Sequence, residues 1–563
     1  MVDKFLSSRW AKFLFAISVV AFTGLHTNTG SIIVMALNIS AAFVLALFLE
    51  CKYKILSKAF KIKSRKYALI ALPISIYTII EIMLSSYNSL NNLIVRIFIS
   101  ENPLAHEMRS LLPEQIMWIG LYMFLVAAGV ITFFVVFVAV YAIVSRFKRI
   151  ATIVWQRTDK LERVYLVAAV LTLGIFVAVV YDLSPVFWGD NSLPRRGFGL
   201  IYGLDIGRNI AEADDGQFVS TRFGNIKRLF YPLVNLPFAL TARALGRILF
   251  FVPLAYVYFL QLFHITLMAC GGIFLARMCN IAKFSKKYFL ALYTVSYSFL
   301  LFSIPLERYV LPTFCVILLM YVCTYVPKHK YAVALAAAGT LTTSLVLLPF
   351  VAFDRKIKTW FFNLLKLVGA FAAICILYGK LPILYRPIQA VLWQLNSFAG
   401  GVSTEEKALQ FINFVASIFV KPETTLIYKE CRTDAMDYVS AYALAVPVFV
   451  NWIGVVLIAL IIGGFIINRK FRFAQMSFLW VVFAFFILFV MGWQARENEM
   501  FLSSFYFGWA FFVLVFMFFE KLLEKQKIIK YAVYSVMLVV MAIININGII
   551  ELVRFGIEHY PAR

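Results

Sequence analysis

Residues 164–181 read VYLVAAVLTLGIFVAVVY, a run of eighteen residues without a charged side chain. A helix of this length covers about 27 Å, close to the hydrocarbon thickness of a bilayer. The basic segment SRFKRIATIVWQRTDKLER (145–163) precedes the run, and Asp182 follows it. This order predicts a helix that crosses a membrane from the cytoplasmic side outward.

Long apolar runs recur along the whole chain. Its 563 residues are 63% hydrophobic and 14% charged, whereas soluble domains average about half apolar content. The composition therefore predicts an all-α polytopic integral membrane protein with about 13 transmembrane helices. The short alternating segments of a membrane β-barrel are not present in the sequence. The expected spans cover approximately residues 11–25, 31–49, 67–86, 116–143, 164–181, 249–276, 288–304, 309–326, 359–378, 438–467, 475–492, 500–518 and 530–550.

The basic residues predict how the chain is oriented. The formal net charge is +25, and Lys and Arg gather in short loops such as CKYKILSKAFKIKSRK (51–66), which holds no acidic residue. The positive-inside rule then places the N-terminus in the cytoplasm and the C-terminus outside, as in a multi-pass protein of a bacterial inner membrane. This pattern favours the lipid bilayer, and not nucleic acid, as the partner of these charges.

One apolar segment does not fit a simple alternation of spans. Residues 331–353 would leave the cytoplasm, yet the basic sequence DRKIK (354–358) follows them. The stretch GTLTTS (339–344) in their middle suits a helix break, so one interpretation is a re-entrant hairpin of two short helices. Broken backbone at that depth must be shielded by protein or line a cavity. The other interpretation is that one basic loop departs from the positive-inside rule.

The predicted outer loop 182–247 carries an unusual concentration of charge for this chain. If residues 203–215 are helical, three of these side chains share one face at spacings of three and four residues. Carboxylates there can accept a proton or hold a divalent cation, and Arg can hold a phosphate. The alternative is a solvated loop with internal salt bridges. The residues concerned are Asp205, Arg208, Glu212, Asp214, Asp215, Arg222 and Arg228.

Three motifs in order resemble the GT-C superfamily of membrane glycosyltransferases. These are YGLDIGRN (202–209), FYPLVNLPFAL (230–240) and SIPLERYVLP (303–312), and the resemblance covers roughly residues 164–350. Members of this superfamily use sugars linked to polyprenyl or dolichyl phosphate. The resemblance implies transfer of a sugar from a polyprenyl-phosphate donor to a glycan, lipid or protein acceptor on the extracytoplasmic face.

The resemblance also implies roles for particular residues. Asp205 matches the catalytic carboxylate, which would activate the acceptor hydroxyl. The arginines would hold the donor phosphate, and the other acids would support catalysis or bind a divalent cation, Mg²⁺ or Mn²⁺. For Glu307 the alternative is a turn residue that caps the next span. The phosphate-binding candidates are Arg208, Arg222, Arg228 and Arg308, and the supporting or metal candidates are Glu212, Asp214, Asp215 and Glu307.

The chain then divides into three parts. Residues 1–163 form an N-terminal extension of four spans, 164–353 the GT-C-like core, and 354–563 a C-terminal membrane region with an outer loop at 379–437. Amphipathic helices are expected in that loop. His264 lies inside a predicted span, where a helix–helix hydrogen bond is the ordinary role.

Two other functions stay open at this point. A transporter or flippase of lipid-linked glycans would need a polar path through the bilayer and often shows inverted repeats. A polysaccharide polymerase or ligase would rely on Arg residues in the outer loops, so Arg386 or the pair Arg195 and Arg196 would matter more than Asp205.

Overall fold

The computed structural model describes nine continuous stretches of the chain and a few single residues and pairs. The stretches are 32–53, 155–184, 228–249, 255–377, 401–422, 426–433, 436–443, 451–495 and 500–559, and the remaining positions are 12–13, 16–17, 72, 75–76, 137, 187 and 251–252.

The chain divides into two compact units. The first comprises Met1–Thr158, Glu212–Leu233 and Phe353–Pro387, and the second Asp159–Ala211, Val234–Ala352 and Ile388–Arg563. The three-part division drawn from the sequence stays a prediction.

Six helices in the described stretches are long and apolar enough to cross a membrane. This finding is consistent with the predicted helical membrane protein, because each helix can span a hydrocarbon layer of about 30 Å. The helices are α8 (Lys160–Leu183), α11 (Ala255–Met278), α17 (Ile357–Leu377), α22 (Arg472–Phe485) with its π-helical extension η4 (Phe486–Val490), α23 (Ser504–Leu522) with the preceding 3₁₀ turn η5 (Met500–Ser503), and α24 (Lys527–His559).

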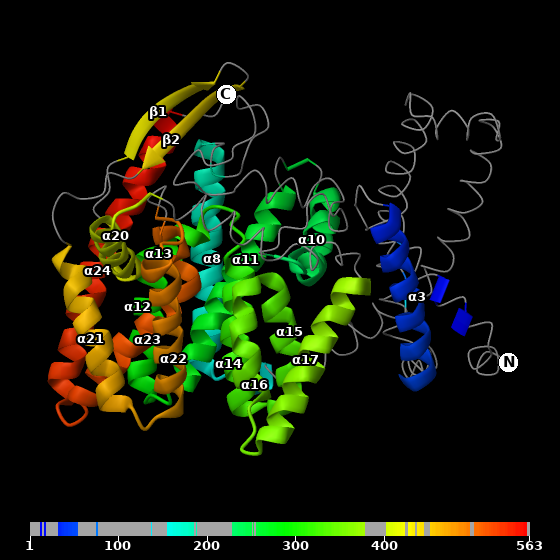
Figure 1. The fold of residues 1–563 in the computed structure, drawn as a ribbon. Helices are drawn as coiled ribbons and strands as arrows, with labels where there is room; N and C mark the ends of the chain where they lie inside the picture. The colour runs from blue at the N-terminus through cyan, green and yellow to red at the C-terminus, as the bar shows by residue number, and fades with distance from the viewer. Residues whose placement is uncertain are drawn as a thin grey trace. The chain divides into compact units, whose positions relative to one another are not determined.

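Figure 1 shows, along with these six helices, the other described elements. They are α3 (Ile32–Tyr53), α10 (Tyr231–Ile248), α12 (Lys283–Val295), α13 (Tyr297–Ser303), α14 (Val310–Tyr325), η2 (Pro327–His329), α15 (Lys330–Thr340), η3 (Thr342–Leu347), α16 (Leu348–Ala352), α20 (Thr404–Phe419), β1 (Leu426–Thr433), β2 (Met436–Ala443) and α21 (Trp452–Asn468).

The first unit contains α3 and α17, which contact each other. Phe230, in the turn before α10, packs on Phe371 of α17 with ring centroids 5.0 Å apart. Most of α17 is otherwise exposed or half-buried, with Phe361 and Leu365 among its exposed side chains. An apolar helix with so much exposed surface suits a lipid environment.

Helix α23 forms the centre of the second unit. Every residue from Ser504 to Met517 is buried, and α23 contacts α20, α21, α22 and α14. Gly464 of α21 lies directly against the carbonyl of Leu514, so a larger side chain there would collide with the α23 backbone. Such close approach over a small residue is how helices pack in membranes.

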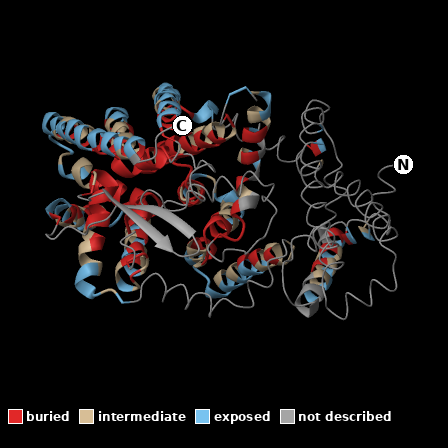
Figure 2. Ribbon diagram, turned by 90° about the horizontal axis from the view of Figure 1, so that it is seen from above, coloured by how far each residue is buried: buried red, intermediate tan, exposed pale blue. Residues whose placement is uncertain are grey.

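The outward surfaces of the second unit are apolar. Buried residues lie on the sides where helices meet, and exposed residues face outward (Figure 2). Leu171 and Ile175 of α8 are 59% and 65% exposed, and Val539 and Ile543 of α24 are 56% and 58% exposed. A band of exposed aliphatic side chains on long helices is what acyl chains would cover.

One predicted span is wrong at its start, where residues 438–443 belong to a strand. Residues 438–467 were expected to be a single long helix, but β1 and β2 form an antiparallel hairpin that pairs Thr433 with Met436 and Leu426 with Ala443. Helix α21 begins only at Trp452, after Asn451 caps it by accepting a hydrogen bond from the N–H of Gly454. The sequence MDYVSAYA of β2 (436–443) holds Tyr and Val, which favour strands. The hairpin is a departure from the all-α prediction.

The predicted span 288–304 is broken into two helices at Ser296. Asn545 of α24, which is fully buried, donates from Nδ2 to the carbonyl of Val295 at 2.7 Å and to that of Phe419 at 2.7 Å. Its Oδ1 accepts from the N–H of Lys421 at 2.8 Å. Asn545 therefore satisfies backbone groups that two helix ends leave open.

The segment 331–353 also breaks, at the place that the sequence predicts. Helix α15 ends at Thr340, and Leu341 has extended backbone angles (φ −150°, ψ 117°). The 3₁₀ turn η3 and the short helix α16 follow, and α16 contacts α15. The chain therefore folds back on itself after the break. The Tyr506 hydroxyl of α23 lies 2.8 Å from Ser344 Oγ and 3.1 Å from Thr343 Oγ, which secures the bend.

We predict that Asn545→Leu lowers the free energy of unfolding by about 1–3 kcal/mol, because three backbone groups lose the hydrogen-bond partner that the buried Asn545 side chain provides. Thermal or denaturant unfolding in detergent micelles measures the effect. The control is Asn547→Leu, a change of the same type at an exposed position two residues further along the helix, which should change stability by less than about 0.5 kcal/mol. Equal effects of the two substitutions would contradict this role of Asn545.

Candidate functional site

Most of the acidic and basic candidates from the outer loop lie outside the described residues. These are Asp205, Arg208, Glu212, Asp214, Asp215 and Arg222. Three candidates are described. Arg228 belongs to the first unit, just before α10, and is 9% exposed. Glu307 and Arg308 belong to the second unit and are adjacent in the turn between α13 and α14.

The turn 304–309 buries two ionisable side chains. Glu307 is 2% exposed and Arg308 is 1% exposed. The backbone N–H of Arg308 donates to Glu307 Oε1 at 2.9 Å. Burial of such groups is costly unless they are paired or hydrogen-bonded. Two of them in one interior turn therefore mark this turn as the first place to look for function.

The local sequence explains why the chain turns here. Pro305 follows the end of α13 at Ser303, and proline is common just after a helix ends because it cannot continue the helix. Pro312 lies in the first turn of α14, where its missing N–H is no loss. Helix α13 ends at Ser303 and α14 begins at Val310, and both Glu307 and Arg308 in the turn between them are buried.

Neighbouring helices hold the turn by its carbonyl groups. Gln261 of α11 donates from Nε2 to the carbonyl of Ser303 at 2.6 Å and to that of Phe302 at 3.3 Å. The Tyr181 hydroxyl, at the end of α8, donates to the carbonyl of Ile304 at 2.7 Å. These donors satisfy the open carbonyl groups at the end of α13.

A second polar segment lies beside the turn, in the connection after α22. Gln494 is 7% exposed and has a left-handed backbone (φ 67°). Its Oε1 accepts from Ser503 Oγ at 2.6 Å, and its Nε2 lies 3.5 Å from the Tyr309 hydroxyl. The ring of Tyr309 is in turn 6.4 Å from that of Tyr506. Polar side chains therefore continue from the turn to the break at Leu341.

Sequence reasoning missed Tyr181, Gln261 and Gln494. Each is a single polar residue at or near the end of an apolar run, and the sequence does not say which carbonyl or hydroxyl it meets. The available signal was the rarity of amide side chains in apolar spans, where polar residues are costly and usually have a function or a partner.

A separate ionic network lies at the opposite end of α8. Asp159 and Glu162 form a capping box at the start of the helix, with hydrogen bonds of 2.8 and 3.1 Å between them. Arg277 of α11 binds Glu162 through Nε at 2.9 Å and Nη2 at 2.5 Å. Lys286 of α12 contacts Glu162 at 2.5 Å and Asp159 at 2.8 Å. The buried Glu162 and the partly exposed Asp159 therefore tie α8, α11 and α12 together.

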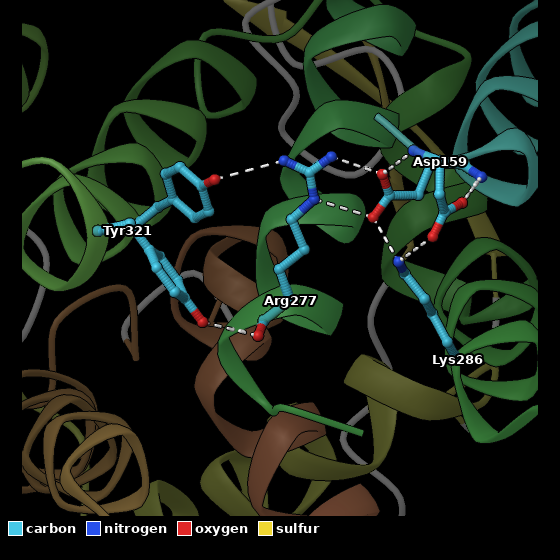
Figure 3. Close-up of polar contacts among 6 residues, drawn as sticks. Asp159, Arg277, Lys286 and Tyr321 are labelled. Carbon is cyan, nitrogen blue, oxygen red and sulfur yellow. Dashed lines mark hydrogen bonds and ion pairs between the residues drawn. The ribbon is translucent and has the colours of Figure 1, made fainter. Parts of the chain in front are cut away.

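Two tyrosines of α14 extend this network. Figure 3 shows Arg277 between Tyr321 on one side and Asp159 and Lys286 on the other. The Tyr321 hydroxyl lies 3.3 Å from Arg277 Nη1, and the Tyr325 hydroxyl donates to the Arg277 carbonyl at 2.9 Å. The charged groups of Glu162, Arg277 and Lys286 are paired within this network. We therefore interpret the network as a structural clamp at the predicted cytoplasmic surface.

The charge of the clamp is favoured at neutral pH. Burial raises the pKa of the Asp159 carboxyl, but Lys286 and the N–H of Glu162 lower the pKa by more, so it lies below its usual value. Because the pKa is lower in the folded protein, this stabilisation is present above the unfolded pKa of about 4 and is lost as the pH falls through the folded pKa.

A metal site is not evident among the described residues. No group of three His, Cys, Asp or Glu side chains in the described stretches could hold an ion. The acidic residues 205–215 lie outside these stretches, so the divalent cation expected there stays a prediction.

We predict that Lys286→Met lowers the free energy of unfolding by about 1–3 kcal/mol at neutral pH, because two carboxylates lose a cationic partner. Denaturant unfolding in detergent micelles measures this change in the free energy of unfolding. The control is Lys287→Met, the same substitution at the exposed neighbouring position. The stability difference should shrink as the pH falls from about 4 through the lowered folded-state pKa of Asp159, because the carboxyl is protonated in both states only below that pKa. No difference between the two substitutions at neutral pH would show that the clamp does not stabilise the fold.

Comparison of the chain with known protein families, with curated proteins and with solved structures finds no match. The turn at Glu307 and Arg308 is therefore interpreted from its own chemistry.

Proposed function

We propose that this protein is an integral-membrane glycosyltransferase of the GT-C type. It would move a sugar from a polyprenyl-phosphate donor to a glycan, lipid or protein acceptor on the extracytoplasmic face. The observation that carries the proposal is the buried turn with Glu307 and Arg308, held by Gln261 and Tyr181. A carboxylate and a guanidinium fixed together offer the two charges that this chemistry needs.

In the proposed reaction, a hydroxyl oxygen of the acceptor forms a bond to C1 of the sugar. The bond from C1 to the phosphate oxygen breaks, and the polyprenyl phosphate leaves with the electron pair. A carboxylate, for which Asp205 is the first candidate, takes the proton of the hydroxyl. Arg308 with the loop arginines would hold the phosphate, and most of the rate increase would come from orientation and a good leaving group.

The membrane arrangement is part of the proposal. We place about 13 spans in a bacterial inner membrane, with the N-terminus inside and the C-terminus outside. Residues 331–353 would form a re-entrant hairpin that enters and leaves from the cytoplasm. The break at Leu341 and the contact of α16 with α15 support this path, and it agrees with the basic segment 354–358.

A transporter of lipid-linked glycans is the second candidate. Helices that break at Ser296 and Leu341 favour it, because transporters build their binding sites from discontinuous helices near the bilayer midplane. A transporter would move the lipid-linked glycan between leaflets and leave its mass unchanged, whereas a transferase would remove the sugar.

We predict that Glu307→Gln and Arg308→Gln each lower sugar transfer by roughly 100-fold or more, since each removes a charge from the reacting groups. Mass spectrometry of lipid extracts from cells that carry only the variant measures the result. The expected outcome is accumulation of the sugar-linked polyprenyl phosphate together with an acceptor that lacks the sugar. Asp205→Asn should have the same effect.

Matched controls are available on α24. Glu558→Gln and Arg554→Gln make the same chemical changes at exposed positions and should leave the lipid profile as in the wild type at equal protein level. If Asp205→Asn behaves as wild type while the turn variants are inactive, the turn supplies the reacting carboxylate. If no variant and no gene deletion changes the lipids, the transferase proposal is wrong.

A further inference from the structure

A second polar site lies deeper along α11 than the turn. His264 is 1% exposed, and neither of its ring nitrogens has a hydrogen-bond partner among the described residues. The Oε1 atom of Gln261, three residues earlier, also lacks a partner there. Residues three apart lie on the same face of a helix. Three unused polar atoms are therefore gathered at one buried place.

The contacts of α11 with α14 show what this place faces. A Cβ on Gly271 would lie 3.3 Å from Ile317 Cδ1, and Arg277 reaches Tyr321 further along, so the two helices run parallel. His264 is seven residues before Gly271, on the same face, and Val310 is seven residues before Ile317. His264 is therefore level with the first residue of α14.

The start of α14 adds hydrogen-bond donors. Its N-cap residue, Tyr309, makes no side-chain capping hydrogen bond, and the first N–H groups of a helix have no partner within the helix. Buried polar atoms in native proteins are nearly always satisfied by protein, water or ligand. A bound polar group enclosed by the protein at this place would supply hydrogen-bond partners for the unpartnered atoms of His264 and Gln261.

The chemistry of the atoms selects the class of ligand. A neutral imidazole offers one donor and one acceptor, and the amide oxygen of Gln261 offers an acceptor. A carboxylate or phosphate would meet the amide oxygen unfavourably. A hydroxyl group both donates and accepts, so one hydroxyl can accept from the ring N–H of His264 and donate to Gln261 Oε1.

We propose that His264 and Gln261, with the start of α14, form a buried site for a single hydroxyl group, either of a water molecule or of a lipid-linked sugar. The site adjoins the Gln261 amide, whose Nε2 donates to the carbonyls of Phe302 and Ser303. It does not depend on the proposed transferase activity, since it is inferred from the unused polar atoms alone.

Solid-state NMR of the full-length protein with ¹⁵N-labelled histidine tests the site directly. The chain has five His residues, and His264→Phe assigns the signals of His264. We expect one protonated and one hydrogen-bonded ring nitrogen, with a through-space correlation to an exchangeable hydroxyl proton. A correlation in synthetic lipid free of glycans identifies water, and one that requires native lipids identifies a lipid-linked hydroxyl.

Thermal unfolding gives a second readout. If a hydroxyl is bound, His264→Phe and His264→Leu lower Tm by about 1–3 °C, since a satisfied hydrogen-bonding group is lost. If the site is dry, removing unsatisfied polar atoms raises Tm. The exposed His329→Phe is the control and should leave Tm unchanged. Ring nitrogens without a hydroxyl correlation in either lipid, or a raised Tm in both His264 variants, would overturn the proposal.

Discussion

The length of α8 between its two polar ends is the constraint on which the rest of the structure depends. Glu162 and Tyr181 are nineteen residues apart in this helix, which corresponds to about 29 Å and matches the hydrocarbon thickness of a bilayer. At one end Glu162 is bound by Arg277 and Lys286, and at the other Tyr181 binds the carbonyl of Ile304. The clamp and the buried turn therefore lie on opposite sides of an apolar layer.

Between these two ends the chain repeatedly interrupts its helices. Each break leaves backbone groups open, and in an apolar layer these groups need partners within the protein. Single polar side chains from distant helices provide them, as Asn545 does at the carbonyl of Val295 and Gln261 does at the carbonyl of Ser303. The breaks keep polar groups inside the protein without exposing them to lipid, and they bring the polar segment of Gln494 next to the turn.

The parts that sequence reasoning predicted are those that local pattern controls. The helix at Lys160–Leu183, the turn at 306–309 and the break within 339–344 follow from apolar length, proline and a run of Thr and Ser. The hairpin at 426–443 was missed because its second strand directly precedes a long apolar run, and the length of the combined run favoured a single helix. The partners of Gln261 and Asn545 depend on tertiary contacts between residues far apart in sequence, so no local pattern could have identified them. The outer-loop acids, Asp205 above all, lie outside the described residues, and their role stays a proposal.

The most direct test of this account is the sidedness of the two ends of the apolar layer. Single cysteines at Asp182 and Lys287, both exposed, would be introduced in a variant without the seven native cysteines and treated in intact cells with a reagent that does not cross membranes. We expect Asp182→Cys to react in intact cells and Lys287→Cys to react only after the membrane is opened. Reaction of both cysteines from the same side would contradict the account, because the clamp and the turn would not then lie on opposite faces of a membrane.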